Sequence, residues 1–297
     1  MSRRKRWVGL LIIAVVLIAL VPIIIAETAV RGMNHRQPDP SYADWVVRET
    51  GARWKSVAIT ATDGAQLNGW LFMPHQANGS AVILLHGVND SRLGMVGHAP
   101  YLLRAGFTVL IPDSRGQGVS GGSLMTYGIQ ESSDVHLWAD RLFRDGSVQR
   151  LYGLGASMGA AILIQSLEKE PRFRSIVADS PFDTFEDIAT YRLGQLSGLG
   201  KWITWPTAQA GFLYARWRYG VDLRKASPAA SIARTRIPIL LIHGTSDVNI
   251  PPAHSTKLHL LNPESTVLWL VPGVPHISAL GAKTDEYVRR VLEWFRR

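Results

Sequence analysis

One serine set between glycines constrains the fold of this chain more than any other feature of its sequence. In RLYGLGASMGAAILIQSL, residues 150–167, Ser157 lies between Gly155 and Gly159, with an apolar run before it and a helix-forming run after it. Glycine at these positions lets a strand turn at once into a helix, because bulkier side chains would collide with neighbouring strands. The pattern therefore predicts a nucleophile elbow, which projects the serine hydroxyl from the edge of a parallel sheet.

A dinucleotide-binding loop is the competing interpretation of the same stretch. Gly153 and Gly155 follow a strand, and Asp179 lies about 20 residues beyond the turn, where a ribose-binding acid is expected. The third glycine of Gly-x-Gly-x-x-Gly would, however, fall at position 158, which is methionine. This interpretation also leaves the rest of the sequence pattern unexplained, so the elbow is favoured.

Alternating strand and helix patterns over residues 54–297 predict one α/β domain, with a mostly parallel central sheet flanked by helices. A hairpin is expected around the Asp63-Gly64 turn. Further strands are expected at residues 81–87, 107–113, 150–155, 175–180, 237–244 and 265–273. Most of these strands end at Gly, Asp, Ser or His, on the edge where open parallel sheets bind ligands.

Residues 181–236 interrupt this alternation. The segment is too long for a single crossover helix, and it carries aromatic side chains that include Trp202, Trp205 and Trp217. We expect a short helical cap over the sheet edge. Its aromatic residues favour an apolar pocket for an acyl or aryl group.

Two further residues complete a candidate catalytic set. A reactive serine needs a base, and the base needs a carboxylate that orients it. Asp247 follows the strand at 237–244, and His276 follows the strand at 265–273, in the chain order Ser-acid-His that this fold uses. Asp179 and Asp183 lie near the same edge and are kept as alternative acids.

From about residue 53 to its end, the chain resembles α/β-hydrolases of the group that contains serine aminopeptidase-like and monoacylglycerol-lipase-like enzymes. The resemblance is carried by five motifs in this order: LLHGVND (84–90), PDSRGQGVSGG (112–122), GASMG (155–159), LLIHGTSDVNIPP (240–252) and VPHI (274–277). Their joint occurrence is highly specific for the fold and less specific for a reaction.

The resemblance implies an oxyanion hole made of the backbone N–H groups of Val88 and Met158. It assigns His86 a structural role in shaping the loop that carries Val88. It also implies a structural role for the loop at 112–122, in which Gln117 replaces a histidine that is common in the family.

Together these residues predict a serine hydrolase that works through an acyl-enzyme, with Ser157 as nucleophile, His276 as base and Asp247 as the orienting acid. The expected substrate is a small-molecule carboxylic ester of the carboxylesterase or lipase class, and lipid-derived esters are included. A peptidase or amidase, an acyltransferase and a non-catalytic membrane-tethered binding protein stay open as alternatives.

Composition narrows the cofactor and partner classes. The chain has no cysteine, which excludes disulfides and thiolate chemistry, and no His-Glu-x-x-His motif, so neither a cofactor nor a catalytic metal is expected. The net charge is +9. No dense basic block interleaved with aromatic residues is present to indicate nucleic-acid binding.

The N-terminal stretch predicts a membrane anchor. Residues 7–26 carry no charge, which is close to the span that crosses a bilayer as a helix, and residues 3–6 are all basic. This bias predicts a single-pass signal-anchor with a cytoplasmic N-terminus and an extracytoplasmic catalytic domain. We expect the stub and span at 1–30 and a linker at 31–53, with a cleaved signal peptide as the alternative. The oligomeric state is not predicted.

Overall fold

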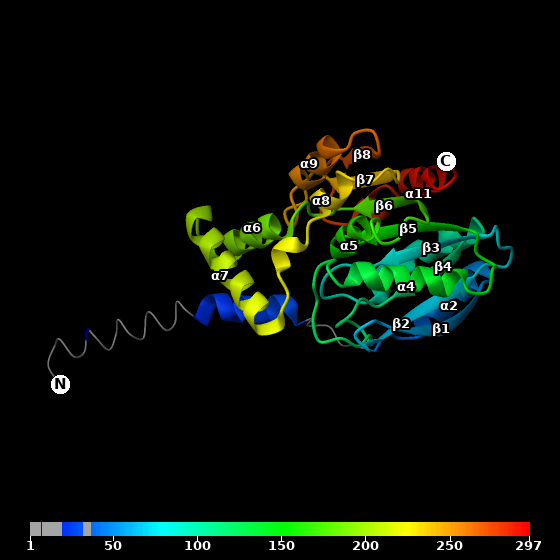
Figure 1. Ribbon diagram of the computed structural model, residues 1–297. Helices are drawn as coiled ribbons and strands as arrows, with labels where there is room; N and C mark the ends of the chain where they lie inside the picture. The colour runs from blue at the N-terminus through cyan, green and yellow to red at the C-terminus, as the bar shows by residue number, and fades with distance from the viewer. Residues whose placement is uncertain (1–6, 8–19, 32–36) are drawn as a thin grey trace.

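A computed structural model describes residues 7, 20–31 and 37–297 of the chain. An eight-stranded sheet forms its centre, in the spatial order β1-β2-β4-β3-β5-β6-β7-β8 (Figure 1). The strands are β1 (Arg53–Thr60), β2 (Gln66–Met73), β3 (Ser80–Leu85), β4 (Thr108–Pro112), β5 (Arg150–Ala156), β6 (Phe173–Asp179), β7 (Ile239–Gly244) and β8 (Thr266–Val271). β1 with β2 and β2 with β4 pair antiparallel, and the pairs from β4 to β8 are parallel. The predicted α/β architecture is therefore confirmed.

Helices cover both faces of this sheet because its central strands are apolar on both sides. Every residue of β3 and of β7 is buried, as expected of strands covered on both faces. One apolar core lies under α4 (Glu131–Phe143), α5 (Met158–Ser166), α8 (Pro228–Ile232) and α9 (Ala253–Leu261). The other lies under α2 (Ser41–Thr50), η1 (Arg92–His98), α3 (Ala99–Arg104), α10 (Ala279–Ala282) and α11 (Thr284–Trp294).

The segment at 181–236 is helical, as its aromatic composition and length led us to expect. It contains α6 (Phe185–Ser197), α7 (Lys201–Tyr219), η2 (Leu223–Lys225) and α8. Helices α6 and α7 project from the sheet as a pair, on the side where the N-terminal helix lies (Figure 1).

The expected linker at 31–53 contains a packed helix, which corrects that part of the prediction. Helix α2 begins after Pro40 and ends at Gly51, which adopts the left-handed conformation that often ends a helix. Ala43 and Val46 are fully buried on one side of it. Two small apolar residues three positions apart were too weak a pattern to predict a helix in this proline-bearing stretch.

Residues 20–30 are helical, and residues 1–6, 8–19 and 32–36 lie outside the described part of the chain. In the described ranges, no helix is both long enough and apolar enough to cross a membrane. Most of the predicted anchor falls in residues 8–19, so it stays a prediction.

The loop at 112–122 joins the sheet to its neighbours through a buried arginine. The guanidinium of Arg115 is 3% exposed and donates to both carboxylate oxygens of Asp134 in α4, each at 2.7 Å. It also donates to Asp63 at 2.8 Å and to Gln130 at 2.7 Å. Because bidentate pairs of this kind fix geometry strongly, the loop has the structural role that the resemblance implied.

Candidate active site

The predicted elbow is present between β5 and α5. Ser157 has φ 55° and ψ −117°, a conformation that non-glycine residues rarely adopt. A Cβ atom at position 155 would lie 2.5 Å from the carbonyl carbon of Gly159, and one at position 159 would collide with the backbone of Leu85. Glycine is required at both positions because the backbone of the turn packs against its own helix and against β3.

The structure brings Ser157, Asp247 and His276 together. His276 Nε2 lies 3.0 Å from Ser157 Oγ, and His276 Nδ1 lies 2.5 Å from Asp247 Oδ2. An ionised carboxylate only accepts hydrogen bonds, so Nδ1 of the neutral ring carries the proton and Nε2 accepts from the serine hydroxyl. Three side chains from the ends of β5, β7 and β8 thus form one hydrogen-bonded line.

Asp247 is held as a carboxylate by its surroundings. Its Oδ1 accepts from the backbone N–H groups of Asn249 and Ile250, both at 2.9 Å. Burial alone raises the pKa of Asp247, but hydrogen bonds from His243 and His276 and from the Ile250 N–H outweigh it, so the pKa lies below its ordinary value. A negative charge beside the imidazole stabilises the imidazolium that forms when the ring takes up a second proton.

His243 is a site residue that sequence reasoning missed. It is fully buried at the end of β7, and its Nε2 lies 3.2 Å from Asp247 Oδ2 and 2.8 Å from the carbonyl oxygen of Ile250. Its Nδ1 lies 2.7 Å from Ser255 Oγ in α9. The sequence signal for this contact was that Asp247 follows His243 by four residues, just beyond the end of the strand.

The loop after β3 reaches Ser157 and is held by two buried side chains. Nδ1 of His86 lies 2.8 Å from the carbonyl oxygen of Gly87, and its Nε2 accepts from the N–H of Ser114 at 3.0 Å. The amide oxygen of Gln117 accepts from the N–H of Asp90 at 3.2 Å. His86 therefore has the structural role that was expected, and Gln117 supports the same loop.

Val88 and Met158 are the residues predicted to form the oxyanion hole. Both line the same cavity as Ser157 and His276, Val88 from the loop after β3 and Met158 as the first residue of α5. The N–H groups in the first turn of a helix have no partner within that helix. The positions fit an oxyanion hole, and the role itself remains a prediction.

Asp179, one of the alternative acids, does not contact His276. Its carboxylate is buried and accepts from Ser180 Oγ at 3.0 Å and from the Tyr287 hydroxyl at 3.3 Å. Burial raises the pKa of Asp179 to about 6, which the hydrogen bond from Ser180 only partly offsets. Its backbone oxygen accepts from the N–H of Ser157 at 2.8 Å.

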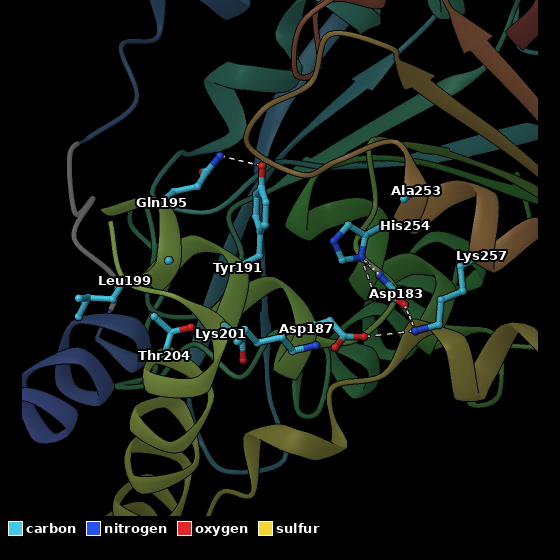
Figure 2. Close-up of a pocket in the computed structure, with 12 residues that line it drawn as sticks. Asp183, Asp187, Tyr191, Gln195, Leu199, Lys201, Thr204, Ala253, His254 and Lys257 are labelled. Carbon is cyan, nitrogen blue, oxygen red and sulfur yellow. Dashed lines mark hydrogen bonds and ion pairs between the residues drawn. The ribbon is translucent and has the colours of Figure 1, made fainter. Parts of the chain in front are cut away.

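Asp183, the other alternative, belongs to a separate cavity of about 580 Å³ between α6, α7 and α9. Figure 2 shows His254 and Lys257 converging on its carboxylate. His254 Nδ1 lies 2.6 Å from Asp183 Oδ1, and Lys257 Nζ lies 2.5 Å from Asp183 Oδ2. Burial alone raises the pKa of Asp183, but hydrogen bonds from His254 and Lys257 outweigh it and lower the pKa to about 2. Ser157 does not line this cavity, so Asp183 has no place beside the nucleophile.

A cavity of about 550 Å³ opens on Ser157 and His276. Its walls come from the loop after β3, from α6 and from the N-terminal helix, and most of them are apolar. The apolar lining includes Ile25, Ala29, Val88, Met125, Tyr127, Phe182, Phe185, Ile188, Leu193, Leu196, Ile250 and Ile277. Arg192 is the cation among the described lining residues, and it donates to Asn249 Oδ1 at 3.0 Å. In the described ranges, no group of acidic and histidine side chains could hold a metal ion.

A known protein family matches the part of the chain that contains this site. The sequence model of the prolyl oligopeptidase family matches residues 94–297, which carry Ser157, Asp247 and His276. The chain belongs to the prolyl oligopeptidase family. This family is not the group of hydrolases that the motifs resemble. Both belong to the α/β-hydrolase superfamily, in which those motifs are common.

The chain is also similar to individual proteins in sequence and in fold. The protein YqkD of Bacillus subtilis is 28% identical over 239 residues, which are 80% of this chain and 77% of YqkD. The fold is similar to esterase Pf2001 of Pyrococcus furiosus, with a TM-score of 0.70 and 24% identity over 90% of this chain and 98% of the esterase. It is also similar to Est1E of Butyrivibrio proteoclasticus, solved with ferulic acid, with a TM-score of 0.63 and 18% identity over 81% of this chain and 100% of Est1E.

We expect Asp247→Asn to lower kcat by about 10⁴-fold on any substrate that the wild type hydrolyses, because the neutral amide favours the wrong imidazole tautomer. The matched control is Asp183→Asn, which removes a carboxylate from the neighbouring cavity and should change kcat only a few-fold. Steady-state kinetics of both variants provide the measurement. Equal losses in the two variants would show that Asp247 is not the acid that serves His276.

We expect Asp179→Asn to stabilise the protein at pH 8 but not at pH 4. The pKa of Asp179 is higher in the folded chain than in the unfolded one, so ionisation costs folding stability as pH rises from about 4 through 6. A difference of about 2 pKa units corresponds to about 3 kcal/mol, all of it expressed at pH 8. Urea unfolding at the two pH values measures this, with the exposed Asp285→Asn as control. A gain of the same size at pH 4 would contradict the assignment.

Proposed function

We propose that this chain is a serine carboxylesterase that acts through an acyl-enzyme. The observation that carries the proposal is the hydrogen-bonded line from Asp247 through His276 to Ser157, which ends at a mostly apolar cavity. Membership of a hydrolase family supports the reaction class.

Each group has one role in the proposed mechanism. Ser157 Oγ attacks the ester carbonyl carbon while His276 Nε2 takes the hydroxyl proton. The N–H groups of Val88 and Met158 donate to the oxyanion, and loss of one such donor typically costs about 2.7–4 kcal/mol of transition-state stabilisation. The intermediate then expels the alcohol, which receives its proton from His276. Water releases the acyl group by the same route.

Esters are favoured over peptides by the lining of the cavity. A peptide substrate brings a charged amino terminus or polar backbone groups that need fixed partners, whereas most of this lining is aliphatic or aromatic. Asp90 is the carboxylate among the described lining residues, and its Oδ1 already accepts from the N–H of Ser91 at 2.7 Å. The matched family makes amide or peptide hydrolysis the second candidate.

We expect a fluorophosphonate probe to label the full-length chain in detergent and to leave Ser157→Ala unlabelled. On a panel of p-nitrophenyl esters and the matching p-nitroanilides, we expect kcat/KM to be at least about 100-fold higher for the esters. If the probe labels Ser157 but no ester is cleaved, or if the anilides are cleaved as fast as the esters, the proposed activity would be that of an amidase and not of an esterase. Absence of labelling in the wild type would favour the non-catalytic alternative.

We also propose that the uncharged stretch at 7–26 holds the enzyme at a membrane through its residues 7–19, with the catalytic domain on the extracytoplasmic side, because Pro22 and Ile25 pack on that domain. The uncharged sequence and its basic flank support this. So does helix α7, which exposes Trp202, Trp205, Leu213 and Trp217. Tryptophan is enriched where proteins meet the interface of a bilayer. Such a location would give the site access to lipid-derived esters.

For a chain expressed in bacterial cells, we expect the protein to stay in the membrane pellet after extraction with alkaline carbonate. Alkaline phosphatase fused after Arg297 should be active, because it folds only outside the cytoplasm. Release into the supernatant together with a mass that lacks the N-terminal residues would instead support a cleaved signal peptide. An inactive fusion would contradict the proposed orientation.

A further inference from the structure

Helix 20–30 forms part of the wall of the catalytic cavity. Ile25, Thr28 and Ala29 line the same space as Ser157 and His276. The sequence alone predicts this stretch as the end of the membrane anchor at 1–30, with no part in the site. Its position beside the nucleophile raises the question of what it does there.

The helix is fixed to the cap by a polar cluster. Glu27 accepts hydrogen bonds from the hydroxyls of Tyr214 and Tyr219, at 2.7 Å and 2.5 Å. Arg31 forms an ion pair with Glu27 at 2.6 Å and also donates to the Tyr219 hydroxyl at 3.2 Å. A Cβ atom at Gly211 of α7 would lie 3.2 Å from the Pro22 carbonyl oxygen, which shows how closely the two helices approach.

The same helix is joined to the catalytic domain at its other end. The N–H of Met125 donates to the carbonyl oxygen of Val30 at 2.7 Å. The hydroxyl of Tyr127 donates to the carbonyl oxygen of Ala29 at 2.8 Å. Val30 is 1% exposed and belongs to the main apolar core. The ring of Tyr127 in turn stacks on Phe185 of α6 at 3.8 Å. These contacts make the helix a built part of the folded enzyme rather than a free tether.

We propose that helix 20–30 is a specificity-determining wall of the acyl-binding pocket. The acyl chain of the substrate lies between Ile25 and Ala29 on one side and the apolar face of α6 on the other. The substrate class is then a carboxylic ester with an aliphatic acyl chain long enough to pass Ser157 and reach this helix. The inference rests on the proposed esterase function and adds a residue-level prediction of acyl selectivity.

Two adjacent isoleucines provide a matched test. Ile25 lines the cavity, whereas Ile24 is 58% exposed on the other side of the helix. Ile25→Trp puts a large ring into the space assigned to the acyl chain. Ile24→Trp puts the same ring on the exposed surface of the helix, outside the cavity. In full-length protein, we expect Ile25→Trp to lower kcat/KM for p-nitrophenyl octanoate at least about tenfold relative to p-nitrophenyl acetate. Ile24→Trp should leave that ratio within about twofold of wild type.

A binding measurement separates failure of this inference from failure of the esterase proposal. In the Ser157→Ala background, dansyl-undecanoate fluorescence reports occupation of an apolar pocket without any turnover. We expect Ile25→Trp to weaken its binding at least about fivefold and Ile24→Trp to leave it unchanged. A cooperative thermal unfolding transition, measured for each variant, would show that the variant is folded.

If both isoleucine variants behave alike in acyl selectivity and in dansyl-undecanoate binding, helix 20–30 does not bound the acyl site and the inference is wrong. If the wild type cleaves no ester but Ile25→Trp still selectively weakens binding, the helix does bound an apolar ligand site and the esterase proposal alone is wrong.

Discussion

The left-handed backbone of Ser157 is the constraint on which the rest of the site depends. A non-glycine residue in such a region costs on the order of 1–3 kcal/mol, so its surroundings must hold it there. The N–H of Ser157 donates to the Asp179 carbonyl oxygen at 2.8 Å, and its own carbonyl oxygen accepts from Ala161 at 3.1 Å. Gly155 and Gly159 leave the space that the turn needs. The hydroxyl consequently projects where the ends of β7 and β8 can reach it.

Two carboxylates at this edge acquire opposite properties from their surroundings. Asp247 receives two backbone N–H groups and two histidines, so hydrogen bonding outweighs burial and its pKa falls. Asp179 receives only two hydroxyls, so burial dominates and its pKa rises to about 6. An acid that stabilises a positive imidazolium must itself be charged at neutral pH. Both carboxylates are largely charged at that pH, so contact decides between them: Asp247 Oδ2 lies 2.5 Å from His276 Nδ1, whereas the carboxylate of Asp179 is bound by Ser180 and Tyr287.

The cavity in front of the serine is assembled from segments that are far apart in the chain. The loop after β3 is set by His86 and Gln117, while α6 is braced by the stacking of Phe185 on Tyr127. Helix 20–30 closes a further side and is tied to both the cap and the sheet domain. A hydrolase fold of common topology thus obtains a pocket whose shape depends on its N-terminal segment as well as on its cap.

Local pattern alone determined the strands, the elbow and the loops that carry Asp247 and His276. This is because the carboxyl ends of parallel strands meet at one edge whatever the details of packing. Local pattern did not reveal helix α2, the support that His243 gives to Asp247, or the place of helix 20–30 in the pocket. The contact between Glu27 and Tyr214 joins positions 187 apart in the chain. An apolar residue such as Ile25 has the same sequence signature whether it faces lipid or protein, so only the tertiary structure could decide which of the two it meets.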